Sequence, residues 1–166
     1  MTDRFYYNVL FLCTHNSARS ILAEAIMNKI SGGRFKAFSA GSSPTWKVHP
    51  FALETLQKAG HDTINLRSKN WNEFAIPNAP KMDFVFTVCD TAAGEVCPLW
   101  PGQPIRAHWG LADPSRVEGD DESRRAAFYK TYQEINRLIH KFVSLPIEKL
   151  DRISLQKELS KLGAEE

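Results

Sequence analysis

The sequence alternates between short apolar runs that favour β-strands and longer segments in which apolar residues recur at helical spacing. The expected strands are Tyr6–Leu12, Phe35–Ala40, Met82–Val88 and Ile105–Trp109. The expected helices are Ile21–Ile30, His49–Ala59, Glu122–Leu145 and Ser154–Leu162. Strands that alternate with helices pack as a parallel sheet, because each crossover lays a helix against one face. We therefore expect a doubly wound, three-layer α/β/α fold.

The chain is 166 residues long, a length that suits one domain around a single core. We expect one domain over 1–166, with a core at about 5–145 and a helical extension at 146–166. The net charge of +2 is too small to favour nucleic acid or an anionic membrane as a partner. The N-terminus lacks the form of a signal peptide, and no apolar run approaches the length of a membrane span. A cytoplasmic protein is the expectation.

In a parallel sheet of this type, ligands bind beyond the carboxyl ends of the strands, where the connections to the helices open. Two of the three cysteines stand at such ends. Cys13 directly follows the first expected strand, and Cys89 follows the strand Met82–Val88. The carboxyl ends of these two strands are therefore the places to look for a site.

Cys13 begins a polar loop, Cys13–Ser20 (CTHNSARS), that joins the first strand directly to the first helix. A loop that wraps into a helix start points several backbone N–H groups inward, and such donors suit a phosphate-sized oxyanion. The positive potential of the helix N-terminus also favours a thiolate at the head of the loop. Arg19 can place its planar fork on two oxygens of the anion. Ser20 can donate a hydrogen bond to the thiolate, and Asn16 can brace the loop.

The loop therefore predicts an oxyanion site with Cys13 as the nucleophile and Arg19 as the anion clamp. The predicted oxyanion-binding residues are Thr14, His15, Asn16, Ser17, Ala18 and Arg19. A cysteine six positions before an arginine is a weak pattern by itself, since Cys13 could be buried filler and Arg19 a solvated helix residue. Its position at a strand-to-helix turn is what favours the functional interpretation.

A candidate for proton transfer lies late in the chain, where Asp113 and Pro114 follow His108–Gly110 in a loop before the longest helix. Displacement at an oxyanion requires a proton for the departing oxygen. A loop aspartate can supply that proton if partial burial and a nearby anion raise its pKa. An Asp-Pro pair is also a common turn, so the pattern alone leaves both readings open.

The loop Cys13–Ser20, the segment Ser39–Gly41 and the pair Asp113-Pro114 together resemble the low-molecular-weight protein tyrosine phosphatase superfamily. The resemblance spans most of the chain, through about Leu145. It implies a four-stranded parallel sheet with flanking helices. It also implies that the loop cysteine attacks phosphorus or arsenic, and that Asp113 is the general acid.

The two later cysteines bear on the choice between a phosphatase and a reductase. A phosphatase needs only the loop and the acid, whereas an arsenate reductase also needs thiols that supply electrons. Cys89 ends a predicted strand, and Cys97 follows eight residues later. Together with Cys97–Pro101, His108–Gly110 and Asp113-Pro114, this layout resembles the thiol-linked arsenate reductases of the same superfamily.

That second resemblance implies an enzyme that converts arsenate to arsenite in arsenic detoxification. Cys13 would attack arsenate, Cys89 would attack the resulting adduct, and Cys97 would then form a disulfide with Cys89. Thioredoxin, or glutaredoxin with glutathione, would reduce this redox-active disulfide. A variant in which only one further thiol works, with glutathione and glutaredoxin closing the cycle, also stays open.

Two other functions stay open. A low-molecular-weight protein tyrosine phosphatase is the main alternative, because Trp46 resembles the aromatic residue at the rim of the phosphatase pocket. Against it, Ala18 stands where those phosphatases usually carry a second loop cysteine. Ser115 and Arg116 also stand where they usually carry tyrosines. The third candidate is a non-catalytic oxyanion sensor or thiol switch.

No cofactor or metal is expected. Thioredoxin-linked reductases of this type often bind potassium beside the loop through side-chain oxygens, and Asn16, Glu24 and Ser39 fit part of that set. The remaining part reads Arg67-Ser68-Lys69, which offers cations where oxygen ligands are needed. A lysine or arginine could serve the same electrostatic purpose by itself.

Overall fold

A computed structural model describes residues 6–89, 100 and 103–164 of the chain. Its strands, in chain order, are β1 (Tyr7–Cys13), β2 (Phe35–Gly41), β3 (Phe84–Thr87) and β4 (Ile105–His108). Its α-helices are α1 (Arg19–Ile30), α2 (Pro50–Lys58), α4 (Asp121–Val143) and α5 (Arg152–Ala164). Three short 3₁₀ turns are η1 (Trp71–Phe74), η2 (Pro114–Arg116) and η3 (Ile147–Lys149).

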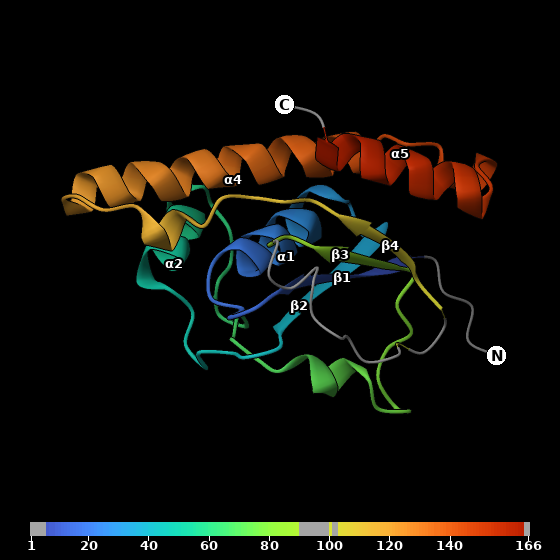
Figure 1. The fold of residues 1–166 in the computed structure, drawn as a ribbon, viewed down its shortest axis with the longest axis horizontal. Coiled ribbons are helices and arrows are strands. Elements are labelled where there is room, and N and C mark those ends of the chain that lie inside the picture. The colour runs from blue at the N-terminus through green and yellow to red at the C-terminus, as the bar shows by residue number, and fades with distance from the viewer. Residues whose placement is uncertain (1–5, 90–99, 101–102, 165–166) are drawn as a thin grey trace.

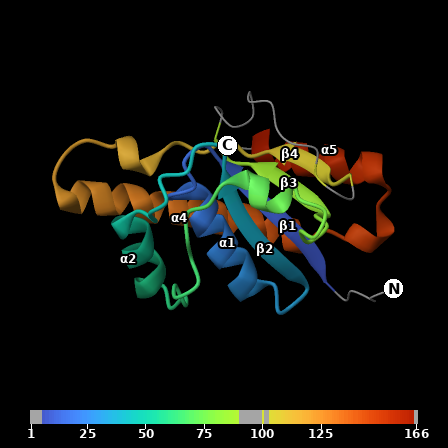
Figure 2. The same cartoon turned by 90° about the horizontal axis from the view of Figure 1, so that it is seen from below.

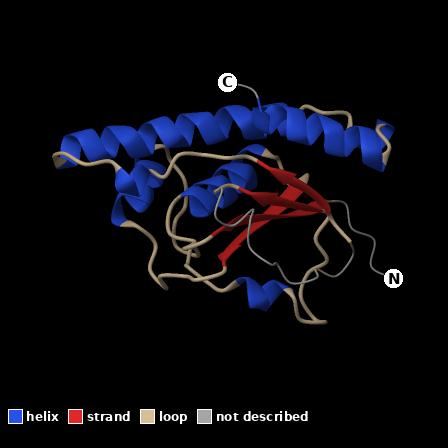
Figure 3. Ribbon diagram, viewed as in Figure 1, coloured by secondary structure: helices blue, strands red, loops and turns tan. Residues whose placement is uncertain are grey.

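The four strands form one parallel sheet in the order β2-β1-β3-β4 (Figures 1 and 3). In register, Leu12 pairs with Ala40 on one side and with Thr87 on the other. Thr87 in turn pairs with His108 of β4. Because all strands run the same way, their carboxyl ends meet at one edge of the sheet. The predicted α/β fold with a four-stranded parallel sheet is confirmed.

One face of the sheet packs against α1, α4 and α5 and forms the larger core. Aromatic rings dominate it: Phe86 lies with its ring centroid 4.1 Å from that of Trp109 and 5.2 Å from that of Phe142. Phe11 of β1 stacks on Phe86 at 5.5 Å. Burial of such large rings supplies much of the hydrophobic free energy that holds the helices on this face.

The opposite face carries the other residues of the central strands, since side chains alternate along a strand. Leu10 and Leu12 of β1 and Val85 of β3 pack there against Trp71 and Trp100. Seen from the side of η1, α4 and α5 lie behind the sheet (Figure 2). The near-continuous apolar runs of β1 and β3 follow from burial on both faces.

The C-terminal helix α5 packs against β4 and the segment that follows it. Leu155, Leu159 and Leu162 join the larger core, and Trp109 Nε1 donates a hydrogen bond of 3.1 Å to the Leu159 carbonyl. Gly163 lies so close to this segment that an added Cβ would stand 2.3 Å from the His108 carbonyl oxygen. Helix α5 is therefore in direct contact with the chain that leads from β4 to Asp113.

All eight expected elements are present, with shifted ends. The strand predicted as Met82–Val88 is shorter in the structure, at Phe84–Thr87. The helix expected from Ile21 begins at Arg19, because the polar loop winds directly into it. The helix expected from His49 has that residue as its N-cap, whose Nδ1 accepts a hydrogen bond from Phe51 N at 3.0 Å. In the described part of the chain, no helix is both long and apolar enough to cross a membrane.

Candidate active site

The parallel sheet brings two cysteine thiols together at its carboxyl edge. Cys13 is the last residue of β1, and Cys89 comes two residues after the end of the neighbouring strand β3. Both are buried free cysteines, and the Cys89 side chain is the neighbour that most strongly raises the pKa of Cys13. Cys89 Sγ also accepts a hydrogen bond from Thr14 N at 3.3 Å and lies 3.5 Å from Thr14 Oγ1. The third cysteine of the sequence prediction, Cys97, lies outside the described residues.

The loop between β1 and α1 is held by Asn16, which is fully buried and adopts a positive φ of 48°. Asparagine tolerates this left-handed backbone better than most residues. Its Nδ2 donates to Ser20 Oγ at 2.8 Å, and its Oδ1 accepts from Lys69 N at 2.9 Å. Asn16 therefore ties the loop to α1 and to a segment 53 residues away, through bonds to a side chain and to the backbone of Lys69.

Backbone carbonyls of the loop are bonded on its outer side. Ser43 N donates to the Thr14 carbonyl at 2.9 Å, and His49 N donates to the Ser17 carbonyl at 2.9 Å. The His15 carbonyl accepts from Ser68 Oγ at 3.1 Å. Because the N–H and C=O of a peptide point in opposite directions, this arrangement turns the loop N–H groups toward the inner side. That orientation is the one an oxyanion cradle needs.

Gly41 allows β2 to lie against this loop. A Cβ at Gly41 would stand 2.5 Å from the Thr14 carbonyl oxygen and 2.7 Å from that of Cys13, closer than real Cβ atoms come. Gly41 N donates to the Lys69 carbonyl at 2.9 Å. The Ser39–Gly41 segment, singled out in the sequence, therefore serves close backbone approach at its last position.

The pKa of the Cys13 thiol is raised, which differs from the expectation for a cysteine at a helix start. The largest cause is its hydrogen bond to Cys89, which favours the protonated form of Cys13, and burial adds to it. Arg19 and the His15 backbone N–H lower the pKa, but they are outweighed. Sequence reasoning missed this effect because Cys89 lies 76 positions further along the chain.

Arg19 is the first residue of α1 and bridges the loop to the late Asp113 segment. Its side chain is 11% exposed. Its Nη1 donates to the Leu111 carbonyl at 3.0 Å, and its Nη2 lies 3.4 Å from Asp113 Oδ2. The structure therefore brings the predicted clamp and the predicted acid into contact.

Asp113 is the N-cap of η2, and its Oδ1 accepts from Ser115 N at 2.9 Å and from Ser115 Oγ at 2.7 Å. Burial raises the pKa of this carboxyl, but the two Ser115 hydrogen bonds and the charges of Arg19 and Arg116 outweigh it. The net pKa is lowered, and the raised value that the sequence analysis describes depends on an anion beside the carboxyl in addition to burial. The carboxylate is stabilised by the same guanidinium that is predicted to hold the oxyanion.

Trp46 stands on the loop after β2, with a positive φ of 64° and 68% of its surface exposed. Trp46 N donates to Ser68 Oγ at 3.1 Å, and the same hydroxyl donates to the His15 carbonyl. A bulky residue rarely adopts this backbone conformation, so Ser68 helps to hold it. The backbone of Trp46 is thereby held beside the outer side of the loop.

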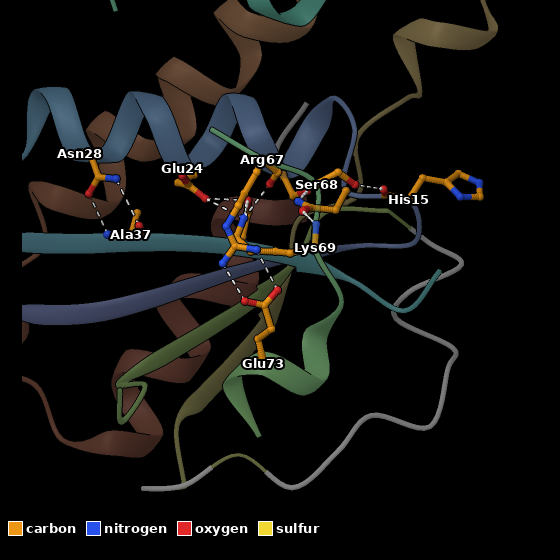
Figure 4. A network of polar contacts seen from close by, with 11 residues as sticks. His15, Glu24, Asn28, Ala37, Arg67, Ser68, Lys69 and Glu73 are labelled. Atoms are coloured by element: carbon orange, nitrogen blue, oxygen red, sulfur yellow. Dashed lines mark hydrogen bonds and ion pairs between the residues drawn. The ribbon is translucent and has the colours of Figure 1, made fainter. Parts of the chain in front are cut away.

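Lys69 belongs to the segment that would complete the potassium site of similar thioredoxin-linked reductases (Figure 4). Its Nζ lies 2.8 Å from the Arg67 carbonyl oxygen, 3.5 Å from Ser39 Oγ and 3.6 Å from Glu24 Oε1. The oxygens that would coordinate a cation therefore already surround an ammonium group. These residues do not fit a bound potassium ion.

Comparison with known proteins identifies the family to which a chain with this fold and loop belongs. The family model described as "Low molecular weight phosphotyrosine protein phosphatase" matches residues 8–160. A protein of Halalkalibacterium halodurans named arsenate reductase is 36% identical over 134 residues, which are 81% of this chain and 93% of that protein.

Two solved structures have the same fold. The thioredoxin-dependent arsenate reductase of Corynebacterium glutamicum matches with a TM-score of 0.56 and 26% identity, over 84% of this chain and 65% of that one. The low molecular weight protein tyrosine phosphatase of T. tengcongensis matches with a TM-score of 0.62 and 28% identity, over 87% of this chain and 99% of that one. With its cysteine-headed loop at the end of β1 and a family match over nearly its whole length, this chain belongs to the low molecular weight phosphotyrosine protein phosphatase family.

Proposed function

We propose that this chain is an arsenate reductase in which Cys13 is the nucleophile and Cys89 supplies the second thiol. The observation that carries the proposal is the placement of two buried free thiols at the carboxyl edge of the sheet, where Cys89 Sγ accepts from Thr14 N of the loop at 3.3 Å and raises the pKa of Cys13. A phosphatase has no use for a second thiol there, whereas reduction of arsenate consumes two. The relative named arsenate reductase, 36% identical over most of both chains, supports the same reaction.

Arsenate is a tetrahedral oxyanion of the kind that inward-facing N–H groups and a guanidinium bind. We assign its binding to the loop residues Thr14, His15, Asn16, Ser17, Ala18 and Arg19. Contacts with the Leu111 carbonyl and Asp113 already hold the Arg19 guanidinium in place beside the loop. When its fork turns to an anion, its hold on Asp113 weakens and the bound negative charge raises the pKa of that carboxyl. The acid is thereby prepared by substrate binding.

In the first step, the Cys13 thiol gives its proton to the bound arsenate dianion, and the resulting thiolate attacks arsenic and forms an S–As bond. One As–O bond breaks, and Asp113 gives the leaving oxygen its proton so that it departs as water. Ser20 Oγ accepts from Asn16, which leaves its own hydrogen to stabilise the Cys13 thiolate. Arsenic is still pentavalent at this point.

In the second step, the Cys89 thiolate attacks the sulfur of Cys13. An S–S bond forms, the S–As bond breaks, and its electron pair stays on arsenic, which leaves as trivalent arsenite. Cys97 then attacks Cys89, which frees Cys13 and leaves a Cys89–Cys97 disulfide. Cys89 starts this sequence beside the loop, with its Sγ 3.3 Å from Thr14 N, the residue that follows Cys13.

The cycle needs an external dithiol or thiol to reduce the final disulfide. We propose thioredoxin as that partner, and glutaredoxin with glutathione as the alternative. The thioredoxin-dependent reductase of Corynebacterium glutamicum supports the first choice by its shared fold.

Steady-state turnover tests the proposal. The purified protein should oxidise NADPH only when arsenate and a coupled thioredoxin or glutaredoxin system are present, and Cys13→Ser and Cys89→Ser should each abolish this activity. Cys97→Ser should abolish thioredoxin-coupled turnover while sparing any glutathione route. Full multiple-turnover activity of Cys89→Ser would contradict the thiol relay, and an inactive parent protein would favour an oxyanion sensor.

A tyrosine phosphatase is the second candidate, favoured by the exposed indole of Trp46 beside the loop. Its test is the hydrolysis of a phosphotyrosyl peptide. Efficient hydrolysis that is unchanged in Cys89→Ser and lost in Asp113→Asn would establish the phosphatase over the reductase. Weak hydrolysis of small aryl phosphates would not establish the phosphatase, since a reductase and a phosphatase of this family share the loop.

A further inference from the structure

We infer that Lys69 is a built-in cation that positions the oxyanion loop and replaces a bound monovalent metal ion. The inference rests on the proposed function only in that both use the loop as an oxyanion site. It concerns oxyanion binding, which is measurable without any arsenate turnover.

The surroundings of Lys69 are those of a buried, coordinated ion. The residue is 6% exposed, and its ammonium contacts one carbonyl, one hydroxyl and one carboxylate oxygen, those of Arg67, Ser39 and Glu24 (Figure 4). Ser39 Oγ also donates to Glu24 Oε1 at 2.7 Å, so the carboxylate is held on the side that faces the ammonium.

The charges of this cluster depend on each other. Burial lowers the pKa of Lys69 and raises that of Glu24, and the attraction between the two opposes both shifts. A buried charge without a partner is costly, so loss of the ammonium leaves the Glu24 carboxylate to take up either a proton or another cation. On the outer side, Arg67 is held by two hydrogen bonds to Glu73, of 2.9 and 2.6 Å.

The backbone of Lys69 ties this cluster to the loop from two directions. Lys69 N donates to Asn16 Oδ1 at 2.9 Å, and its carbonyl accepts from Gly41 N at 2.9 Å. Asn16 in turn donates to Ser20 Oγ. A single residue thus fixes the left-handed turn of the loop and, through Asn16, the Ser20 hydroxyl at the start of α1. Lys69 touches no substrate in this arrangement and acts as a positioning residue.

The oxygens around the ammonium would suit a hard cation if the lysine side chain were removed. Carbonyl, hydroxyl and carboxylate oxygens are the donors that such ions prefer. Lys69→Ala keeps these oxygens and opens the space, whereas Lys69→Met fills the space without a charge. The pair of variants therefore separates the charge at this position from the volume of the side chain.

The test measures the affinity of the loop for inorganic phosphate by calorimetry, in buffers that contain either potassium or tetramethylammonium ions. The wild type should bind phosphate equally in both. Lys69→Ala should bind about tenfold more weakly in tetramethylammonium, the low end of what loss of a supporting contact costs at metal sites. Lys69→Met should also bind phosphate more weakly in tetramethylammonium. Potassium should restore most of the phosphate affinity of Lys69→Ala and none of that of Lys69→Met.

Lys58→Met is the matched control, because the Lys58 side chain on α2 is 71% exposed, and it should behave as wild type in both buffers. A merely structural role would lower the melting temperature of Lys69→Ala without any potassium-specific recovery of phosphate affinity, and would overturn the inference. Phosphate binding by the wild type that requires potassium would also overturn the inference. If Lys69→Ala does not fold, Lys69→Gln in the same two buffers replaces it, with the same weakened binding expected. If phosphate binding follows these expectations but the protein does not turn over arsenate, the proposed function is refuted and the inference about Lys69 stands.

Discussion

At the scale of single residues, the contact between Cys13 and Cys89 shapes the chemistry of the site. It keeps the proton on Cys13 and holds Cys89 against the first N–H of the loop. In the proposed mechanism the oxyanion competes for that N–H, so substrate binding and the release of Cys89 are linked. The pair therefore favours disulfide formation between the two sulfurs over a permanent thiolate at Cys13.

Removal of Cys89 should lower the pKa of Cys13. Cys89→Ala deletes the hydrogen bond that most strongly raises it, so the thiolate fraction of Cys13 at neutral pH increases. The rate of Cys13 alkylation by iodoacetamide, followed on the Cys13 peptide by mass spectrometry, should rise at pH 7. Its midpoint against pH should move to lower pH. An unchanged pH profile would show that the Cys89 contact does not control the thiol.

The pH dependence of turnover should respond to Ser115. Its hydroxyl donates to Asp113 Oδ1 at 2.7 Å and stabilises the charged carboxylate, so Ser115→Ala raises the pKa of Asp113. In the proposed mechanism Asp113 is the protonated acid, and kcat should therefore persist to higher pH in this variant. The descending limb of the kcat profile shifts upward, while Ser160→Ala on the exposed face of α5 leaves it in place. A shift to lower pH would contradict the role of Asp113.

At the scale of elements, the strands and helices were predictable because their apolar periodicity is local. So was the loop, since Cys13, Arg19 and Ser20 stand at fixed spacing between a strand and a helix. Contacts between distant segments were not predictable from such patterns. The hydrogen bond from Lys69 to Asn16 spans 53 positions, and the carbonyl that holds Arg19 belongs to Leu111, 92 positions away. The pKa values of Cys13 and Asp113 depend on contacts of this kind.

Helix α5 reaches the site indirectly, through the segment between β4 and Asp113. Trp109 packs on the sheet and donates its indole N–H to α5, while Leu111, two residues later, supplies the carbonyl that holds Arg19. The helix therefore supports the position of the clamp without touching it. The sequence predicted the helix but not this connection, because the contact depends on Gly163 having no Cβ.

Gly163→Ala should disturb both stability and the site. Its Cβ would stand 2.3 Å from the His108 carbonyl oxygen and 2.7 Å from Trp109 Cδ1, so α5 must shift. Overpacking of this kind costs about 1–3 kcal/mol in the free energy of unfolding, measured by urea denaturation. Phosphate affinity should fall with it, whereas Ser160→Ala should change neither. Wild-type stability in Gly163→Ala would show that α5 is not closely docked.

At the scale of the whole molecule, one edge of the parallel sheet collects groups from the full length of the chain. The ends of β1 and β3 supply the two thiols, the turn after β4 supplies Asp113, and the segment before η1 supplies Lys69 (Figure 1). None of these is near another in sequence. The fold makes a two-electron relay possible because neighbouring parallel strands end side by side.

The most direct test of the account is a single turnover of the fully reduced protein with excess arsenate and no external reductant. Free thiols are then alkylated, and the arsenite and the disulfides are measured. The account predicts about one arsenite per chain, a disulfide between Cys89 and Cys97, and an alkylated Cys13. Absence of arsenite, or arsenite formed while Cys89 stays available for alkylation, would contradict it.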